Sequence, residues 1–213
     1  MFTRQQIPNL LTFARVAAVP LCLIIMLFVP YQPAALFWIF VAASLTDFLD
    51  GYLARKWKVV SLLGTLLDPI ADKLLVALML VYLLMVSTVP FLISPLFLPV
   101  MVILLRELYI AGLREFLASR QIKLPVSKGG KLKTALQMFA VSLLLMQLVY
   151  EAIPMPLYCT APFAPPFTET CSAPIPRLAA VLSSFGLPLL YAAALLAFTS
   201  AVGYTRAAMK ALR

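Results

Sequence analysis

Residues 34–55 read AALFWIFVAASLTDFLDGYLAR, an apolar run long enough to cross a membrane that ends in two aspartates and an arginine. A carboxylate inside a membrane is costly unless a cation or another partner compensates its charge. Two further aspartates, Asp68 and Asp72, follow in the next apolar run, and the chain has no aspartate besides these and Asp47 and Asp50. The stretch therefore predicts a transmembrane helix whose end carries half of an acidic site.

The composition is typical of an integral membrane protein. Of 213 residues, 63% are hydrophobic and 12% are charged, and the mean hydropathy is +1.01. The apolar runs are continuous, which predicts helices. We expect one all-α membrane domain, residues 1–213, with six transmembrane helices and a short interfacial helix within residues 1–9. The predicted spans are residues 10–29, 34–54, 65–85, 95–117, 132–150 and 179–201.

Basic residues follow every second predicted span, whereas the loops 30–33 and 86–94 carry no charge. Because Lys and Arg gather on the cytoplasmic side, both termini are expected in the cytoplasm, in a multi-pass protein of the cell inner (cytoplasmic) membrane. The net charge of +9 is explained in part by this topology, and no soluble basic module points to nucleic acid. The basic positions on the expected cytoplasmic side are Arg4, then Arg55, Lys56 and Lys58, then Arg120, Lys123 and Lys128, and finally Arg206, Lys210 and Arg213.

Histidine is absent, which excludes His-based triads and His-containing zinc sites. Cys159 and Cys171 share a proline-rich loop, residues 154–176, that the topology places outside the cytoplasm. Either a disulfide or two free thiols fits there.

Helical spacing places Asp47, Asp50, Gly51 and Ala54 on one face, and Gly64, Asp68 and Asp72 on one face of the next helix. A short basic connection joins the two helices, so four carboxylates can converge. Oxygen ligands at this density suit two divalent ions, Mg²⁺ or Mn²⁺. Two alternatives stay open: the acids form the pathway of a divalent-metal transporter, or the small residues serve close helix packing.

The whole pattern, D-x2-D-G-x2-A-R-x8-G-x3-D-x3-D, resembles the signature of the CDP-alcohol phosphotransferase family at every fixed position. Members are membrane enzymes with six transmembrane helices, usually homodimers, that transfer a phosphatidyl or similar group from a CDP-linked donor to an alcohol and release CMP. The resemblance implies metal ligation by Asp47, Asp50, Asp68 and Asp72, with Asp72 as the catalytic base. It also implies CDP binding by Gly51, Ala54, Arg55 and Gly64.

The segment Ile7-Pro8-Asn9-Leu10-Leu11-Thr12 is similar to the start of phosphatidylglycerophosphate synthases and cardiolipin synthases in this family. Asn9, Thr12 and Arg15 recur every three residues, so they either line the CDP pocket from the first helix or cap and anchor that helix.

A second polar group follows in the fourth and fifth spans. Arg106 and Arg114 are two turns apart on one helix face and need anionic partners, either Glu107 and Glu115 or a phosphate. With Lys131 and Lys133 they resemble the acceptor-phosphate site of a phosphatidylglycerophosphate synthase.

The expected reaction is transfer of the phosphatidyl group from CDP-diacylglycerol to glycerol 3-phosphate at a site that faces the cytoplasm. Rival readings are a cardiolipin synthase, an inositol-phosphate transferase and the metal transporter.

Overall fold

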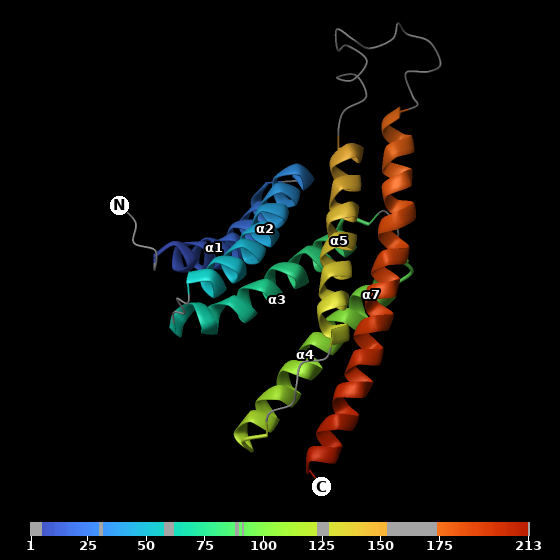
Figure 1. Ribbon diagram of the computed structural model, residues 1–213. Coiled ribbons are helices and arrows are strands. Elements are labelled where there is room, and N and C mark those ends of the chain that lie inside the picture. The colour runs from blue at the N-terminus through green and yellow to red at the C-terminus, as the bar shows by residue number, and fades with distance from the viewer. Residues whose placement is uncertain are drawn as a thin grey trace, which may run out of the picture. The chain divides into compact units, whose positions relative to one another are not determined.

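The computed structural model describes residues 6–29, 32–57, 62–87, 90, 92–122, 128–152 and 174–212 (Figure 1). At residues 6–12, 47–57, 62–66, 68–69, 128–131 and 174–177 it describes the backbone without the side chains. Across the described ranges the fold is all-helical, with six helices and no strand, which confirms the all-α part of the predicted fold class. That all six helices cross a membrane, with both termini in the cytoplasm, stays a prediction. The helices are α1 (Gln6–Phe28), α2 (Pro33–Trp57), α3 (Leu62–Met85), α4 (Phe97–Ser119), α5 (Lys128–Glu151) and α7 (Pro174–Leu212).

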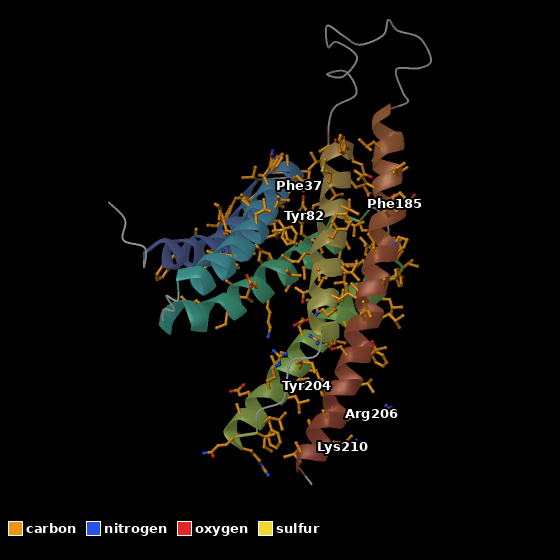
Figure 2. The ribbon with its side chains drawn as sticks, viewed as in Figure 1. Phe37, Tyr82, Phe185, Tyr204, Arg206 and Lys210 are labelled. Carbon is orange, nitrogen blue, oxygen red and sulfur yellow. The ribbon has the colours of Figure 1, made fainter. Side chains whose placement is uncertain are left out.

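Each predicted span coincides with a helix, but several helices are longer than the apolar run inside them. α7 continues to Leu212, eleven residues beyond its predicted end, through Arg206 and Lys210 (Figure 2). Hydropathy marks the part of a helix that suits lipid, whereas backbone hydrogen bonding continues into the polar part. Residues 6–9, expected in a separate interfacial helix, form the first turn of α1.

The described helices differ in how clearly they suit a membrane. Within the described residues, two segments are long and apolar enough to cross one, Leu132–Glu151 and Leu178–Leu212, and shorter apolar stretches cover Phe13–Phe28 and Pro33–Thr46. Many large apolar side chains are exposed, among them Phe28, Trp38 and Phe185. Such surfaces are rare on soluble proteins and suit contact with lipid.

Two compact units make up the chain. The first comprises Met1–Tyr82 and Ser142–Ser183, and in it α1 packs against α2. Its buried side chains include Phe40 of α2 and Met79 of α3.

The second unit comprises Leu83–Val141 and Ser184–Arg213. On α4, the buried residues Ile103, Ile110 and Leu117 recur every seven positions and form one stripe. On α7, Ala193 and Ala197 are buried, and their small side chains allow a neighbouring helix to approach closely.

Within this unit, α4 and α7 lie side by side and run in the same direction. The Tyr191 hydroxyl donates to the backbone oxygen of Pro95, just before α4, at 2.9 Å. Fourteen residues further along each chain segment, the hydroxyls of Tyr109 and Thr205 are 3.0 Å apart. Because contacting positions rise together along both helices, the helices are parallel, as expected for two spans that enter the membrane from the same side.

The C-terminal end of α4 is closed by its own backbone. Gln121 has a left-handed φ of 59°. Its N–H donates to the carbonyl of Ala118 at 3.0 Å, and the N–H of Ile122 donates to the carbonyl of Leu117 at 3.0 Å. This is the Schellman arrangement, in which glycine usually occupies the left-handed position. α4 therefore ends on backbone hydrogen bonds, and the Ser119 hydroxyl also donates to the carbonyl of Phe116 at 2.7 Å.

Candidate active site

The acidic motif lies on two unbroken helices. α2 runs through Asp47 and Asp50, and α3 runs through Asp68 and Asp72, so the helical spacing assumed from the sequence is present. The side chains of Asp47, Asp50 and Asp68 lie outside the described part of the structure, as do the side-chain positions of the expected CDP site. Convergence of the acids and binding of two metal ions stay predictions. The CDP-site residues concerned are Asn9, Thr12, Gly51, Ala54, Arg55 and Gly64.

Asp72 is held by an arginine from the first helix. The Arg15 Nη1 donates to Asp72 Oδ1 at 3.0 Å, and this ion pair joins α1 to α3 inside the first unit. The Arg15 side chain is 1% exposed and that of Asp72 is 38% exposed. A guanidinium so deeply buried requires an anionic partner, and Asp72 supplies it.

The sequence contained a signal for this pair, although we did not predict it. Arg15 lies inside the first apolar run, where an isolated positive charge is costly. The partner is 57 positions away, on a helix that local spacing does not connect to α1. The two readings offered for Arg15, the CDP pocket and an interfacial anchor, did not include contact with the expected base.

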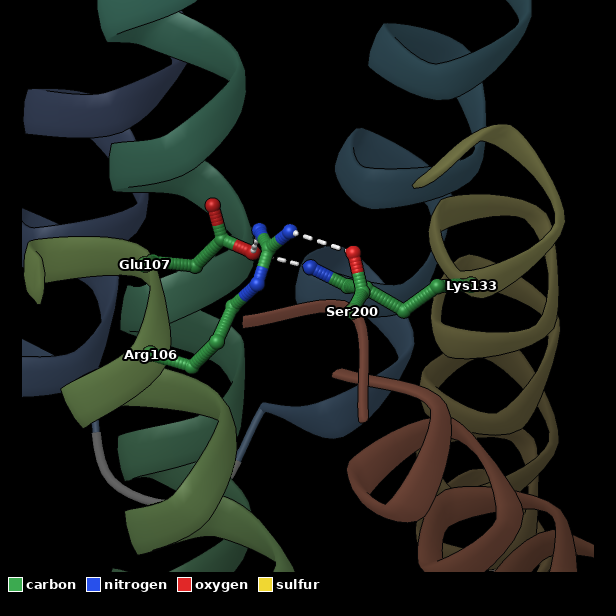
Figure 3. A network of polar contacts seen from close by, with 4 residues as sticks. All are labelled: Arg106, Glu107, Lys133 and Ser200. Carbon is green, nitrogen blue, oxygen red and sulfur yellow. Dashed lines mark hydrogen bonds and ion pairs between the residues drawn. The ribbon is translucent and has the colours of Figure 1, made fainter. Parts of the chain in front are cut away.

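A second polar cluster, hereafter the basic cluster, consists of Arg106, Glu107, Lys133 and Ser200 (Figure 3). The Arg106 Nη1 donates to Glu107 Oε1 at 2.9 Å, and Lys133 Nζ donates to the same oxygen. The Arg106 Nη2 donates to Ser200 Oγ at 3.3 Å. The cluster therefore joins α4, the start of α5 and α7 within the second unit.

The basic cluster carries more positive than negative charge. Its side chains are largely buried, with 12% of Arg106, 3% of Lys133 and 24% of Glu107 exposed. The Glu107 carboxylate thus accepts hydrogen bonds from two cationic side chains, Arg106 and Lys133. The Arg106 Nε–H is also buried, and no described residue accepts a hydrogen bond from it. Glu107 is a partner of Arg106, as the glutamate reading predicted, but the open Nε–H donor of Arg106 also suits a bound anion.

The structure brings together Arg106 and Lys133, two of the four residues predicted to bind the acceptor phosphate. Arg114 instead lies with its guanidinium carbon 5.5 Å from the centre of the Tyr204 ring, a cation–π contact with α7. No described contact links Arg114 to the basic cluster. The Lys131 side chain lies outside the described residues, as do Cys159 and Cys171 of the expected external loop.

The basic cluster lies where α4 and α7 change character. On the N-terminal side of Arg106, α4 reads FLPVMVILL, and on its C-terminal side it carries Arg114. Between Leu178 and Ser200, α7 carries no charged residue, and beyond Ser200 it carries Arg206 and Lys210 (Figure 2). Since the two helices are parallel, the change from uncharged to charged sequence occurs at the same height along both of them. A membrane–water boundary at this level would let a water-soluble anion reach the basic cluster.

The chain belongs to the CDP-alcohol phosphatidyltransferase family, whose model matches residues 5–164. That match includes the acidic motif, Arg106 and Lys133, and it ends before α7 begins.

Among curated proteins, the chain is 47% identical over 145 residues to the CDP-diacylglycerol–glycerol-3-phosphate 3-phosphatidyltransferase of Rickettsia bellii, covering 67% of this chain and 76% of the relative. It is 43% identical over 143 residues to the protein of the same name from Cereibacter sphaeroides, covering 66% and 63%. It is also 43% identical over 152 residues to a CMP-forming cardiolipin synthase of Oryza sativa, covering 65% and 45%.

Proposed function

We propose that this protein transfers the phosphatidyl group of CDP-diacylglycerol to glycerol 3-phosphate, giving phosphatidylglycerophosphate and CMP. The observation that carries the proposal is the basic cluster, where the buried Arg106 has an open Nε–H that suits an acceptor that is itself phosphorylated. The names of the bacterial relatives agree with this acceptor.

In the proposed reaction, the 1-hydroxyl oxygen of glycerol 3-phosphate attacks the phosphorus that carries diacylglycerol. A new P–O bond forms, the bond from that phosphorus to the CMP phosphate breaks, and CMP leaves with the bonding electrons. The hydroxyl proton passes to Asp72, which is a carboxylate in its pair with Arg15. As the family resemblance implies, Arg106 and Lys133 would bind the acceptor phosphate and Arg55 would bind the CDP.

The donor set fits divalent metal ions. Carboxylates are the ligands that Mg²⁺ and Mn²⁺ favour, and Asp72 is partly exposed, as a ligand shared with substrate must be. Asp47, Asp50, Asp68 and Asp72 would hold two such ions. When bound, the ions would neutralise charge on the diphosphate and make the acceptor hydroxyl more acidic.

We propose that all six described helices cross the inner membrane with both termini and the site on the cytoplasmic side. The alternating basic connections support this topology, and so does the parallel direction of α4 and α7. We further propose a homodimer, as the family resemblance implies.

A cardiolipin synthase, which would use phosphatidylglycerol as acceptor, is the second candidate because of the rice relative. The family membership leaves the metal-transporter reading without support. The two enzyme readings are separated by supplying purified protein with labelled CDP-diacylglycerol and either glycerol 3-phosphate, phosphatidylglycerol or inositol phosphate. Product and CMP should form with glycerol 3-phosphate, in Mg²⁺ or Mn²⁺ and not in chelator. Product with phosphatidylglycerol alone would replace our proposal by the second candidate.

A further inference from the structure

The residues of α7 lie beyond the part of the chain that matches the family model, yet one of them joins the basic cluster. Ser200 is the α7 side chain that contacts Arg106. No residue of α7 was predicted to take part in the chemistry. Its contact with a predicted substrate-binding arginine indicates that α7 contributes more than a membrane anchor.

The geometry at Arg106 defines what Ser200 does. The two terminal nitrogens of the guanidinium have different partners, Glu107 on the same helix and Ser200 on α7 (Figure 3). Nη2 lies on the same edge of the planar guanidinium as the Nε–H. Ser200 therefore borders the edge whose Nε–H has no acceptor among the described residues.

Two contacts from different helices fix the plane of a side chain that is otherwise very flexible. A free arginine loses conformational freedom when it binds a ligand, and this loss weakens binding. An arginine whose plane is already fixed loses less, and its open Nε–H is a charge-assisted donor for a phosphate oxygen beside Ser200.

We propose that Ser200 is a positioning residue for the acceptor phosphate: it holds the Arg106 guanidinium so that the Nε–H edge stays directed at the phosphate of glycerol 3-phosphate. This inference rests on the proposed function for the identity of the acceptor. It concerns only the phosphate, which any phosphorylated acceptor would supply.

The test compares Ser200→Ala with wild type and with Thr199→Ala. Thr199 is a matched control because it is the adjacent residue and its hydroxyl donates within its own helix, to the carbonyls of Leu195 and Leu196. We expect Ser200→Ala to raise the KM for glycerol 3-phosphate about tenfold, as for loss of a hydrogen bond to a charged group. The kcat and the KM for CDP-diacylglycerol should stay close to wild type, and Ser200→Thr should restore the KM.

A binding measurement keeps the inference separate from the proposed function. Inorganic phosphate, titrated calorimetrically into the purified proteins in detergent, should bind Ser200→Ala about tenfold more weakly than wild type or Thr199→Ala. If wild type does not use glycerol 3-phosphate but this difference in phosphate binding is found, the proposed function is wrong and the role of Ser200 stands. Equal phosphate binding by all three proteins, or a loss of kcat in Ser200→Ala with an unchanged acceptor KM, would overturn the role of Ser200.

Discussion

The ion pair between Arg15 and Asp72 connects the first helix to the expected catalytic base. Of the two side chains, Arg15 is the more deeply buried, so the pair is asymmetric. Removing Asp72 leaves a buried guanidinium without this anion, whereas removing Arg15 leaves a carboxylate that water can reach. The two substitutions should therefore differ in their effects on stability and on turnover.

We expect Asp72→Asn to lower kcat at least ~100-fold, since it removes the proton acceptor. It should also lower the free energy of unfolding by about 2 kcal/mol, as for a weakened hydrogen bond to a charged group. Arg15→Met should destabilise the protein less and lower kcat, because Asp72 loses one of the contacts that orient it. Turnover and thermal unfolding in detergent measure both effects.

The pair would be merely structural if Arg15→Met lost stability while the folded fraction kept wild-type kcat. Arg15→Lys serves as the conservative variant, since it keeps the charge and should recover part of both quantities.

Arg106 and Arg114 have the same residue type and helix face but different environments. Arg106 is in the basic cluster, and Arg114 is exposed against Tyr204. We expect Arg106→Ala to raise the KM for glycerol 3-phosphate by roughly 100-fold, as for loss of a charge-assisted hydrogen bond. Arg114→Ala should raise it by less than about tenfold.

Arg120→Ala is the control for this comparison, because Arg120 is an exposed arginine near the end of α4 whose guanidinium contacts the Phe116 ring. It should leave the acceptor KM close to wild type. A larger effect of Arg114→Ala than of Arg106→Ala would assign the acceptor phosphate to Arg114.

Sequence reasoning at the residue scale succeeded where partners share a helix or lie on two helices joined by a short connection, and it failed where partners lie far apart in the sequence. The grouping of Arg106 with Glu107 follows from adjacency, and that with Lys133 from two spans that meet at a short connection. Arg15–Asp72 and Arg106–Ser200 join positions 57 and 94 residues apart. Such pairs depend on how helices pack, which neither hydropathy nor the spacing of a motif records.

At the scale of the elements, the end of α4 is set by backbone hydrogen bonds around Gln121. A residue with a Cβ atom in the left-handed region carries a steric cost that glycine avoids. We expect Gln121→Gly to raise the free energy of unfolding by about 0.5–1 kcal/mol, after the greater freedom of glycine in the unfolded chain is subtracted. Thermal unfolding in detergent measures the change.

Gln121→Ala is the control, since it removes the amide but keeps the Cβ, and it should give no such gain. An equal gain from both substitutions would attribute the effect to the amide side chain instead of to the backbone conformation.

Helix existence was predictable from the sequence, and helix length was not. The continuous apolar runs located all six described helices, but α7 extends well past its apolar part through Tyr204, Arg206 and Lys210. Residues of good helix propensity continue the helix after the apolar run ends. The predicted end at residue 201 would have excluded Tyr204 and Thr205, two of the contacts with α4.

At the scale of the whole molecule, the proposed topology places the loop with Cys159 and Cys171 outside the cytoplasm. In intact spheroplasts, a membrane-impermeant maleimide should label these two cysteines after mild reduction. It should leave Cys22, which is buried, unlabelled. Mass spectrometry of the labelled peptides reads the result.

A cysteine placed at an expected cytoplasmic position is the complementary test of this topology. Lys210→Cys, in a background without the three native cysteines, should react only after the spheroplasts are opened. Labelling of this variant in sealed spheroplasts would contradict the cytoplasmic placement of the C-terminal end.

The basic residues beyond the basic cluster on α4 and α7 have a consequence for how the two substrates arrive. Glycerol 3-phosphate diffuses from solution toward a cationic surface, whereas CDP-diacylglycerol travels laterally within the bilayer. The reach of such a surface is set by the Debye length, about 8 Å at physiological ionic strength and about 3 Å in 1 M salt. Added salt should therefore slow the capture of glycerol 3-phosphate when its concentration is low, and it should leave the delivery of CDP-diacylglycerol unaffected. The turnover rate would then depend on ionic strength through only one of the two substrates.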